Sequence, residues 1–337
     1  MILQEHTSLK PFNTFGIDAE SLYFTELADE NDLCELLQSG LLQQHSFFIL
    51  GGGSNVIFRQ DYKGIIVKIG LHGIEKVNED KQTIWLKAAA GENWSDFVEY
   101  CISQGWGGVE NLTAIPGTVG ASPVQNVGAY GTEAKDVIDT VEAYEIITGC
   151  KRLFTNAECR FDYRDSIFKN ELKHQYIITS VTFRLQKEPE LQLNYGAIQS
   201  QLNKENILSP SIADVSRVIT RLRETKLPDP SKIGSAGSFF KNPVVSAEQY
   251  QTLKQTYPAM VAYPHHEGYK LAAGWLIEQC GWKGKQLGHV GVYPLQALVL
   301  VNLGDCTGTE VFSLASEIQQ SVQNTFGVEL ETEAIFV

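Results

Sequence analysis

The sequence predicts an α+β protein in two parts, and three observations support this. Its 337 residues exceed the size at which a single hydrophobic core usually keeps growing. Apolar runs of strand length are interspersed with amphipathic patterns of helical period. Between Pro189 and Pro210 the composition turns polar, which indicates a boundary in that region.

In the first part, the patterns favour short strands with a few helices. Residues 29–40 begin with acidic side chains and end with glycine, which are start and stop signals of a helix. Residues 92–105 predict an amphipathic helix whose apolar side holds Trp94, Phe97, Val98 and Cys101. Strands are expected at 21–27, 47–50, 64–70, 83–91, 137–149 and 176–186.

The second part is richer in helices. Residues 210–230 predict a helix that ends before Pro228 and Pro230, since proline rings cannot continue it. Further helices are expected at 247–257, 270–281 and 308–327, and strands at 295–302 and 328–337. We therefore expect a first domain at 1–205, made of two α+β subdomains, and a second at 206–337 whose last strand returns to the active site.

Composition excludes several classes of protein. A formal net charge of −13 argues against a nucleic-acid-binding surface, which needs clustered Lys and Arg. No window supplies the roughly 18 apolar residues of a membrane span, and the N-terminus lacks a signal-peptide pattern. We expect a cytoplasmic monomer that binds neither nucleic acid nor membrane.

Cysteine and histidine do not predict a metal site. The six cysteines are scattered without CxxC spacing, so we expect reduced, mostly buried thiols. His265 and His266 are adjacent, and on a strand they would point to opposite faces. We therefore predict no metal.

Two glycine-rich loops, at 51–55 (GGGSN) and 116–131 (PGTVGASPVQNVGAYG), are candidates for nucleotide binding. Glycine lets a backbone approach a ligand, and exposed amides can hold phosphate oxygens. Side chains such as Ser54, Asn55, Ser122 and Asn126 add donors, and two such loops favour a dinucleotide-sized ligand over simple turns. Neither loop matches the GxGxxG or the GxxxxGK[ST] motif.

Other polar groups remain open to two interpretations. Ser238, in GSFFKNP, lies either in a structural turn or in a pocket wall, and no GxSxG motif marks it as a nucleophile. Arg164 either pairs with Asp165 or binds an anionic ligand. Arg223 and Lys226 follow a helix, where cations are favourable in any case.

The last segment, ELETEAIF, alternates three carboxylates with other residues. On a strand this alternation would place Glu329, Glu331 and Glu333 on one face, either a solvated edge or a cleft in which a carboxylate orients Arg164.

Taken together, these stretches resemble the UDP-N-acetylenolpyruvoylglucosamine reductase family of flavoenzymes. The resemblance runs in order over nearly the whole chain. It covers LKPFNTFGID, ILGGGSNV, AGENW, ENLTAIPGTVGASPVQNVGAYG, CRFDYRDSIFK, TKLPDP, GSAGSFFKNPVVS, KLAAGWLIEQCG, QALVLVN and LETEAIF. The chain resembles the longer-form members, which carry a tyrosine on a loop that closes over the substrate.

The resemblance implies a fold and a reaction. The fold is an FAD-binding domain of the vanillyl-alcohol-oxidase (PCMH) type followed by a smaller α+β substrate-binding domain. The reaction is reduction of UDP-N-acetylglucosamine enolpyruvate to UDP-N-acetylmuramate in peptidoglycan precursor synthesis. Noncovalent FAD takes a hydride from NADPH, which uses the same cleft as the UDP-sugar in turn, and passes it from N5 to the methylene carbon of the substrate.

The resemblance also implies roles for individual residues. Arg164 and Glu333 would stabilise the enolate, and Ser238 would protonate its carbon. The implied cofactor-binding residues are Gly51, Gly52, Gly53, Ser54, Asn55, Pro116, Gly117, Gly120, Ser122, Asn126, Gly128 and Arg223. The implied substrate-binding residues are Tyr163, Tyr195, Lys226, Asn242, Tyr263 and Gln296. The chain departs from some members at Gly52, where they carry glutamate, and at Thr332, where proline is common.

Two alternatives remain at this point. One is another flavin oxidase or dehydrogenase of the same fold, although the glycine loops contain no His or Cys for a covalent flavin link. The other is a non-catalytic protein that binds a UDP-sugar or a flavin.

Overall fold

The computed structural model describes residues 1–230 and 232–337, and the chain divides into two compact units built from interleaved pieces. The first unit comprises Met1–Thr7, Ser21–Gly52 and Lys63–Thr225. The second comprises Ser8–Glu20, Gly53–Tyr62 and Lys226–Val337. The predicted domain limits, 1–205 and 206–337, stay a prediction, because compact units need not coincide with functional domains.

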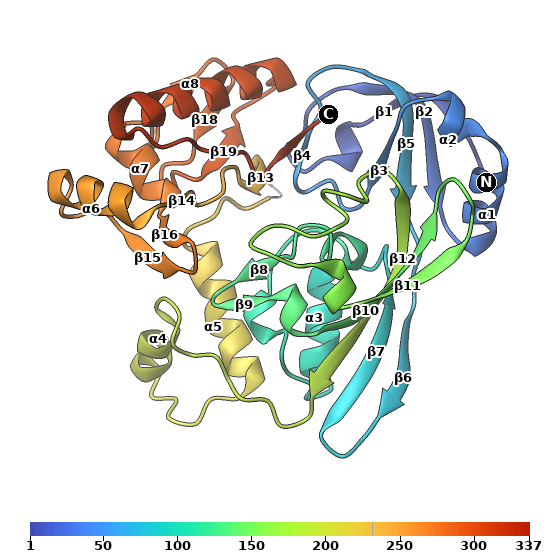
Figure 1. Cartoon of the computed structure of the whole chain (residues 1–337), viewed down its shortest axis with the longest axis horizontal. Helices are drawn as coiled ribbons and strands as arrows, with labels where there is room; N and C mark the ends of the chain where they lie inside the picture. Colours follow the sequence, from blue (N-terminus) through green and yellow to red (C-terminus); the bar gives the residue numbers. More distant parts are fainter. Residues whose placement is uncertain (231) are drawn as a thin grey trace. The chain divides into compact units, whose positions relative to one another are not determined.

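The first unit is built around two sheets (Figure 1). One has the strand order β1-β2-β5-β3, with β3 (Phe47–Leu50) parallel to β5 (Tyr62–Ile69). Its other strands are β1 (Gln4–Ser8) and β2 (Glu20–Leu27). The second sheet has the order β11-β10-β12-β7-β6, and its strands are β6 (Ile74–Glu79), β7 (Thr83–Ala89), β10 (Ile138–Glu145), β11 (Lys151–Thr155) and β12 (Tyr176–Gln186).

Helix α3 (Trp94–Ser103) shows why the apolar pattern folds as it does. All four apolar residues predicted for one side, Trp94, Phe97, Val98 and Cys101, are buried. The Phe97 ring lies 4.6 Å from that of Phe183 on β12. Asn93 caps the helix by accepting hydrogen bonds from the amides of Ser95 and Asp96. Burial of each large side chain contributes about 2–3 kcal/mol, so packing against β12 holds the helix.

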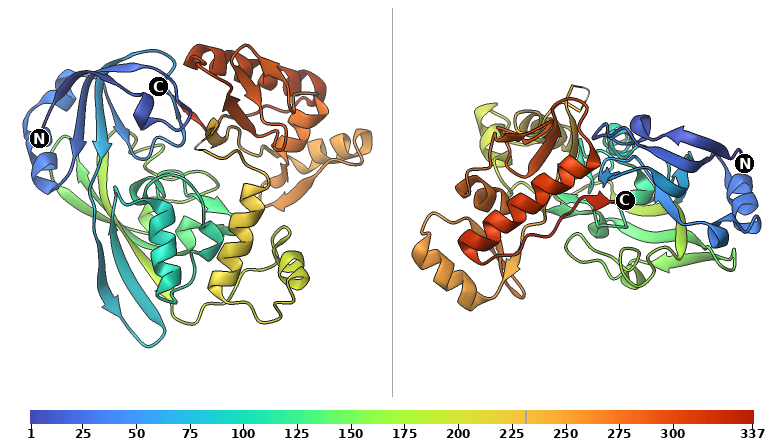
Figure 2. Two further views of the ribbon diagram at one scale, coloured as in Figure 1. Left: turned by 180° about the vertical axis from the view of Figure 1, so that it is seen from behind. Right: turned by 90° about the horizontal axis from the view of Figure 1, so that it is seen from above.

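The remaining elements of this unit are short, except for helix α5 (Ile212–Glu224). α5 packs on α4 (Ile198–Lys204) through a separate apolar cluster and lies beside α3 (Figure 2, left). The others are α1 (Glu30–Gln38), α2 (Leu41–Gln44) and a hairpin of β8 (Gly128–Ala129) and β9 (Thr132–Glu133).

The second unit has a sheet of order β13-β19-β18-β17 against which α8 (Gly308–Phe326) packs. Its strands are β13 (Gly234–Ser238), β17 (Gln286–Leu287), β18 (Val290–Val292) and β19 (Val299–Asn302). A second sheet joins β14 (Val244–Val245), β16 (Gly268–Leu271) and β15 (Ala262–His265). Two helices complete it, α6 (Ala247–Thr256) and α7 (Ala273–Gln279).

The strand predicted at 328–337 is wrong over most of its length. Only β20 (Ile335–Phe336) is a strand, parallel to β4 (Val56–Ile57), and Thr332 makes an isolated bridge with Phe240. The backbone does not follow one partner strand: the Glu331 carbonyl accepts from the amide of Lys241, and the Leu330 carbonyl accepts from the Gln319 side chain on α8. The alternation of Glu329, Glu331 and Glu333 is therefore not carried by a continuous strand.

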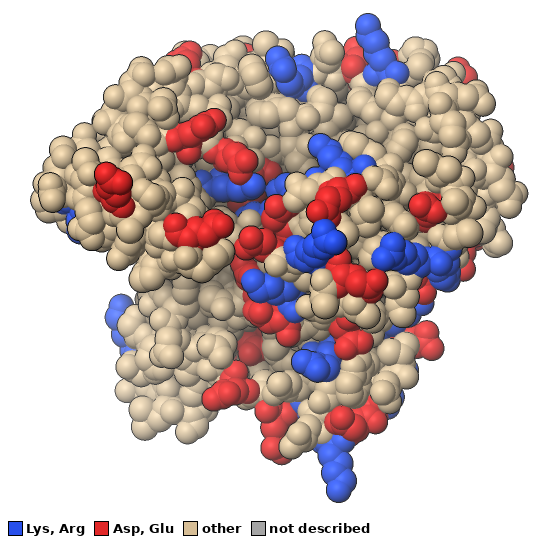
Figure 3. All heavy atoms as spheres, in the orientation of Figure 1, with Lys and Arg blue, Asp and Glu red and all other residues tan. Residues whose placement is uncertain are grey.

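Charge and apolarity of the described residues agree with the composition. None of the described helices combines the length and apolarity that crossing a bilayer requires. On the face drawn in Figure 3, Lys and Arg side chains are interspersed with Asp and Glu and form no continuous basic stripe.

Candidate active site

The two glycine loops meet within the first unit. A Cβ placed on Gly52 would stand 2.9 Å from Cα of Gly117, and one on Gly51 would stand 2.7 Å from Oγ1 of Thr118. Real Cβ atoms do not approach other atoms this closely, so the backbones can touch only because these positions lack side chains. The contact joins the end of β3 to the start of the 116–131 loop.

Polar groups without a partner lie at this contact. Thr118 Oγ1 is buried and makes no hydrogen bond to any described residue. The backbone amides of Gly52, Gly117 and Thr118 likewise donate to none of the described residues. Because a buried hydroxyl without a partner is costly, and because the neighbouring amides can donate as well, the site fits a ligand with several acceptor oxygens, such as a pyrophosphate. Sequence reasoning missed Thr118, although its place inside the glycine loop could have indicated it.

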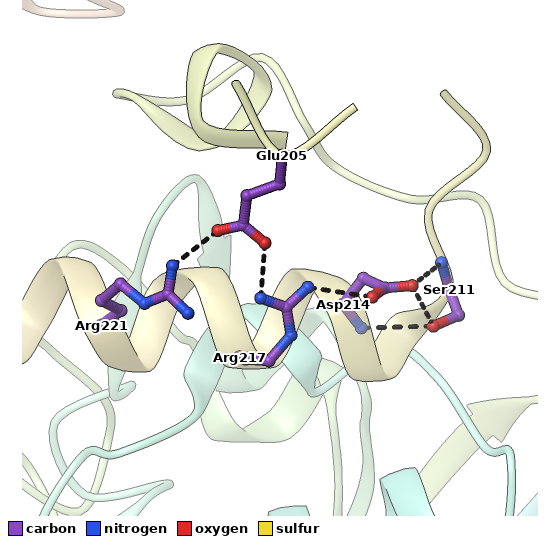
Figure 4. Close-up of polar contacts among 5 residues, drawn as sticks. All are labelled: Glu205, Ser211, Asp214, Arg217 and Arg221. Atoms are coloured by element: carbon purple, nitrogen blue, oxygen red, sulfur yellow. Dashed lines mark hydrogen bonds and ion pairs between the residues drawn. The ribbon is translucent and has the colours of Figure 1, made fainter. Parts of the chain in front are cut away.

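Helix α5 carries three arginines, and one of them differs from the other two in its partners. Arg217 and Arg221 both bind Glu205, at 2.6 and 2.7 Å, and Asp214 completes a capping box with Ser211 (Figure 4). Arg223 has no carboxylate partner among the described residues; its Nε donates to the carbonyl of Ala114 at 3.2 Å. Burial lowers the pKa of the Arg223 guanidinium, which remains charged at neutral pH. A partly buried cation without an anion fits an anionic ligand.

Two predicted donors of the second loop face into the protein. The Ser122 hydroxyl donates to the carbonyl of Val119 at 2.7 Å, and the Asn126 amide group binds three protein groups. Both residues are fully buried. Gly120 packs on Ala90, where a Cβ would stand 2.5 Å from another Cβ. Their predicted cofactor contacts, like those of Ser54 and Pro116, stay predictions. Ser122 and Asn126 could contact the cofactor only through backbone groups, because their side chains bind protein groups.

Arg164 occupies a tight turn of the first unit. Asp162 and Asp165 exchange backbone hydrogen bonds on either side of it, and Arg164 itself has a φ of 55°. Its Nη2 donates to the carbonyl of Gly128 at 2.5 Å, and its guanidinium carbon lies 5.3 Å from the ring of Tyr163. The turn therefore directs the partly buried Arg164 guanidinium toward the β8–β9 hairpin, where its Nη2 is bound to Gly128.

Ser238 lies at the end of β13, in the second unit, just after a β-bulge. The register with β19 shifts between Ser235 and Ser238, and Gly237 has a φ of 67°. Bulges commonly re-aim a side chain beside an active site. The Ser238 side chain is exposed, and its hydroxyl makes no hydrogen bond to a described residue. The next two residues, Phe239 and Phe240, are core residues with at most 1% exposure.

The structure brings Glu333 next to this strand. The Glu333 amide donates to the carbonyl of Phe239 at 2.8 Å, and the Glu333 carbonyl accepts from Nδ2 of Asn55 at 3.0 Å. The backbone of Glu333 is thus fixed one residue from Ser238, by the GGGSN loop and by β13. Of the predicted catalytic residues, Ser238 and Glu333 meet in the second unit, and Arg164 belongs to the first.

The predicted substrate-binding residues fall into two groups. In the first unit, Tyr195 is half exposed and its ring stands edge-on to that of Tyr130, 6.2 Å away. In the second, Asn242 Oδ1 accepts from the amide of Ala273 at 2.9 Å, and Gln296 lies against Gly274, so both reach the start of α7. Tyr263 is exposed on β15. Lys226 is also exposed and is the first residue of the Lys226–Val337 piece of the second unit.

Two expectations about cysteine and histidine need correction. All six cysteines are free, but Cys34 and Cys150 are exposed, and only Cys101, Cys159 and Cys306 are buried. His265 ends β15 while His266 lies in the following turn, so the rings do not alternate across a strand but lie 4.1 Å apart, near Glu267. Alternation along a strand therefore does not keep the two histidines apart, contrary to the expectation.

Comparison with known proteins agrees with this geometry. Residues 22–151 match the model of an FAD-binding domain, and residues 229–337 match the C-terminal domain of UDP-N-acetylenolpyruvoylglucosamine reductase. The chain is 49% identical to the reductase of that name from Chromobacterium violaceum, over 98% of this chain and 97% of the relative. It is 47% identical to that of Pseudomonas aeruginosa over 98% of each chain, and 44% identical to that of Flavobacterium johnsoniae over 99% of each.

The chain belongs to the UDP-N-acetylenolpyruvoylglucosamine reductase family. The crystal structure of the reductase from Thermus caldophilus has the same fold, with a TM-score of 0.68 and 23% identity over 99% of each chain. The predicted fold class is confirmed, and the reductase family makes this protein an FAD-dependent oxidoreductase. The loop contact at Gly52 and Gly117, the Thr118 hydroxyl and Arg223 all fit the phosphates of that cofactor.

Proposed function

We propose that the protein reduces UDP-N-acetylglucosamine enolpyruvate to UDP-N-acetylmuramate with NADPH, as a step in making peptidoglycan precursors. The observation that carries the proposal is full-length identity of 44–49% to reductases named for this substrate. The anion-binding groups of the first unit and the exposed Ser238 beside Glu333 support it independently.

The first unit would hold the cofactor. The amides of Gly52, Gly117 and Thr118 and the Thr118 hydroxyl would donate to its phosphates, and Arg223 would offset their charge. When bound, FAD would supply the two-electron hydride chemistry by which reducing equivalents of NADPH reach the methylene carbon of the enolpyruvyl group. In this proposal NADPH and the UDP-sugar use one cleft in turn.

The chain's own residues complete the reaction. A hydride added to the methylene carbon leaves an electron pair on the neighbouring carbon, delocalised into the carboxylate as an enolate. Arg164 would stabilise that negative charge, and Glu333 would orient and polarise the site. Ser238 would then donate its proton to the carbon, which is a strong enough base to accept it, and the exposed serine would recover a proton from water.

The remaining predicted residues would bind the UDP-sugar. Lys226 and Tyr195 suit a diphosphate, and Asn242 and Gln296 converge at the start of α7, where amide groups can bind sugar or phosphate oxygens. Tyr163, beside Arg164, would contact the substrate at the reacting end, and Tyr263, on the β15–β16 hairpin, would close over it.

The test separates the two half-reactions. Purified protein should show the absorption spectrum of bound flavin and should oxidise NADPH rapidly only when the enolpyruvyl substrate is present. In Ser238→Ala, flavin reduction by NADPH should survive, while reoxidation by the substrate should slow about 10²–10⁴-fold, the usual contribution of a positioned acid.

Ser235→Ala is the matched control, because Ser235 lies on the same strand before the bulge. Protein that binds no flavin when supplied with FAD would overturn the proposal. Equal slowing of both half-reactions in Ser238→Ala would overturn the proton-donor role.

A further inference from the structure

Asn126 is a fully buried residue whose whole side-chain amide is engaged inside the first unit. Its Nδ2 donates to the carbonyl of Asp162 at 2.9 Å and to Oε2 of Glu133 at 3.1 Å, and its Oδ1 accepts from the amide of Lys135 at 3.0 Å. Its φ is 46°, in the left-handed region that asparagine tolerates better than most residues. Both the side chain and the backbone conformation therefore favour asparagine here.

The partners of Asn126 lie on both sides of the Arg164 side chain. Asp162 is the first residue of the Asp162–Asp165 turn, which contains Arg164. Glu133 lies on β9 and pairs with Gly128 on β8, whose carbonyl accepts the hydrogen bond from the Arg164 guanidinium. Asn126 thus ties the backbone that carries Arg164 to the hairpin that receives its side chain.

Asn126 also helps to fix the carboxylate nearest to that hairpin. A Cβ on Gly128 would stand 2.9 Å from Cγ of Glu133 and 3.0 Å from Nη1 of Arg164, so these two side chains flank the glycine. Oε2 of Glu133 is bound to Lys135 at 2.6 Å as well as to Asn126. Without the Asn126 donor, the carboxylate loses one of the bonds that hold it, and the guanidinium is a neighbouring cation to which it can turn.

We propose that Asn126 is a positioning residue for Arg164, in addition to any backbone contact with the cofactor. It acts by holding the Asp162–Asp165 turn against the β8–β9 hairpin and by keeping Glu133 bound to Lys135. The consequence is that the Arg164 cation keeps one orientation, the one in which it would stabilise a developing enolate. This inference rests on the proposed function, in which Arg164 serves the second half-reaction alone.

The experiment uses the flavin-loaded protein and compares Asn126→Ala with Asn156→Ala. Asn156 is a matched control: its Nδ2 also donates to two carbonyls of the same unit, those of Lys135 and Ile138, at 2.8 and 2.7 Å, but it does not contact the Arg164 turn. Asn126→Ala should slow reoxidation of the flavin by the UDP-sugar about 10- to 100-fold, the effect of a small misplacement of a catalytic group. Reduction by NADPH should slow much less than reoxidation, so the ratio of the two half-reaction rates should change.

Asn156→Ala should also lower the melting temperature, by less than Asn126→Ala because its φ of −51° suits alanine, and should leave the ratio of the two half-reaction rates unchanged. Equal slowing of both half-reactions in Asn126→Ala, or the same change of ratio in Asn156→Ala, would show that Asn126 is merely structural. Wild-type protein that reduces its flavin with NADPH but is not reoxidised by the UDP-sugar would refute the proposed function instead.

A second measurement does not depend on turnover. The free energies of unfolding of Asn126→Ala, Arg164→Ala and the double variant form a cycle. If Asn126 positions Arg164, the Arg164 substitution costs less in the Asn126→Ala background than in the wild type, because the bond to Gly128 is already weakened. Strict additivity would overturn the inference.

Discussion

The bulge at Gly237 yields the sharpest prediction about Ser238. Gly237 has a φ of 67°, and a Cβ built there meets nothing within 4 Å. Alanine at this position therefore adds no steric clash and costs only the left-handed backbone, about 1 kcal/mol. If alanine relaxes toward ordinary strand geometry, the bulge is lost and Ser238 is turned away from its present direction.

Gly327 provides an unusually close control. It ends α8 with a φ of 64°, and a Cβ there also meets nothing within 4 Å. Gly237→Ala and Gly327→Ala should each lose about 1 kcal/mol, which corresponds to a melting temperature lower by roughly 2–4 °C in a unit of this size. Only Gly237→Ala should slow reoxidation of the flavin by the UDP-sugar, by about tenfold or more.

The assay is stopped-flow absorbance of the flavin in both half-reactions, together with thermal unfolding followed by circular dichroism. Gly237→Asn should recover part of the rate, since asparagine adopts the left-handed region more readily than alanine. If Gly237→Ala is destabilised like Gly327→Ala and yet reoxidises at the wild-type rate, the bulge does not aim Ser238 and this reasoning is refuted.

Two further predictions concern the contact between the two glycine loops and helix α5. Thr118→Val removes the unpartnered hydroxyl at constant shape; the affinity for FAD should fall about fivefold, the value of one hydrogen bond, while the apoprotein is no less stable. Flavin fluorescence titration measures this, and unchanged affinity would remove Thr118 from the site. On α5, hydrogen bonds from Ser211 and then Arg217 lower the pKa of Asp214 from 3.8 to about 2. Because the folded-state pKa is the lower one, this stabilisation is present above about pH 4 and disappears as the pH falls through 2. Asp214→Asn should lower the melting temperature at pH 7 and converge with the wild type near pH 2; a constant offset would contradict the linkage.

The sequence pattern predicted correctly those elements whose buried side follows from the spacing of their own apolar residues. The apolar side of α3 follows from 3.6-residue spacing, and every residue predicted for it is buried. The alternation at 329–333 has a period of two, but a period of two specifies a strand only where a continuous partner exists. Here residues 239–241 bind Glu331 and Glu333 around a single bridge, and Gln319 on α8 binds Leu330, so no continuous ladder is formed.

The sequence likewise predicted some features of the candidate site and missed others. Glycine content indicated the two loops, but not that Gly52 meets Gly117 across 65 positions of sequence, nor that the Thr118 hydroxyl has no partner among the described residues. Asn126 looked like a donor for a ligand because its partners, Asp162 and Glu133, are unrelated to it by any local spacing. The Gly237 bulge could have been predicted, since an isolated glycine in a strand pattern commonly marks one.

The interleaving of the two units has a consequence for biosynthesis. Two pieces of the second unit, Ser8–Glu20 and Gly53–Tyr62, leave the ribosome long before its main piece, which begins at Lys226. At about 5–20 residues per second, the early pieces wait roughly ten to thirty seconds for their partners. Residues 56–58, which are apolar and buried in the finished protein, are exposed during that interval. Nascent chains of this protein are therefore expected to need protection from aggregation until nearly the whole sequence has been translated.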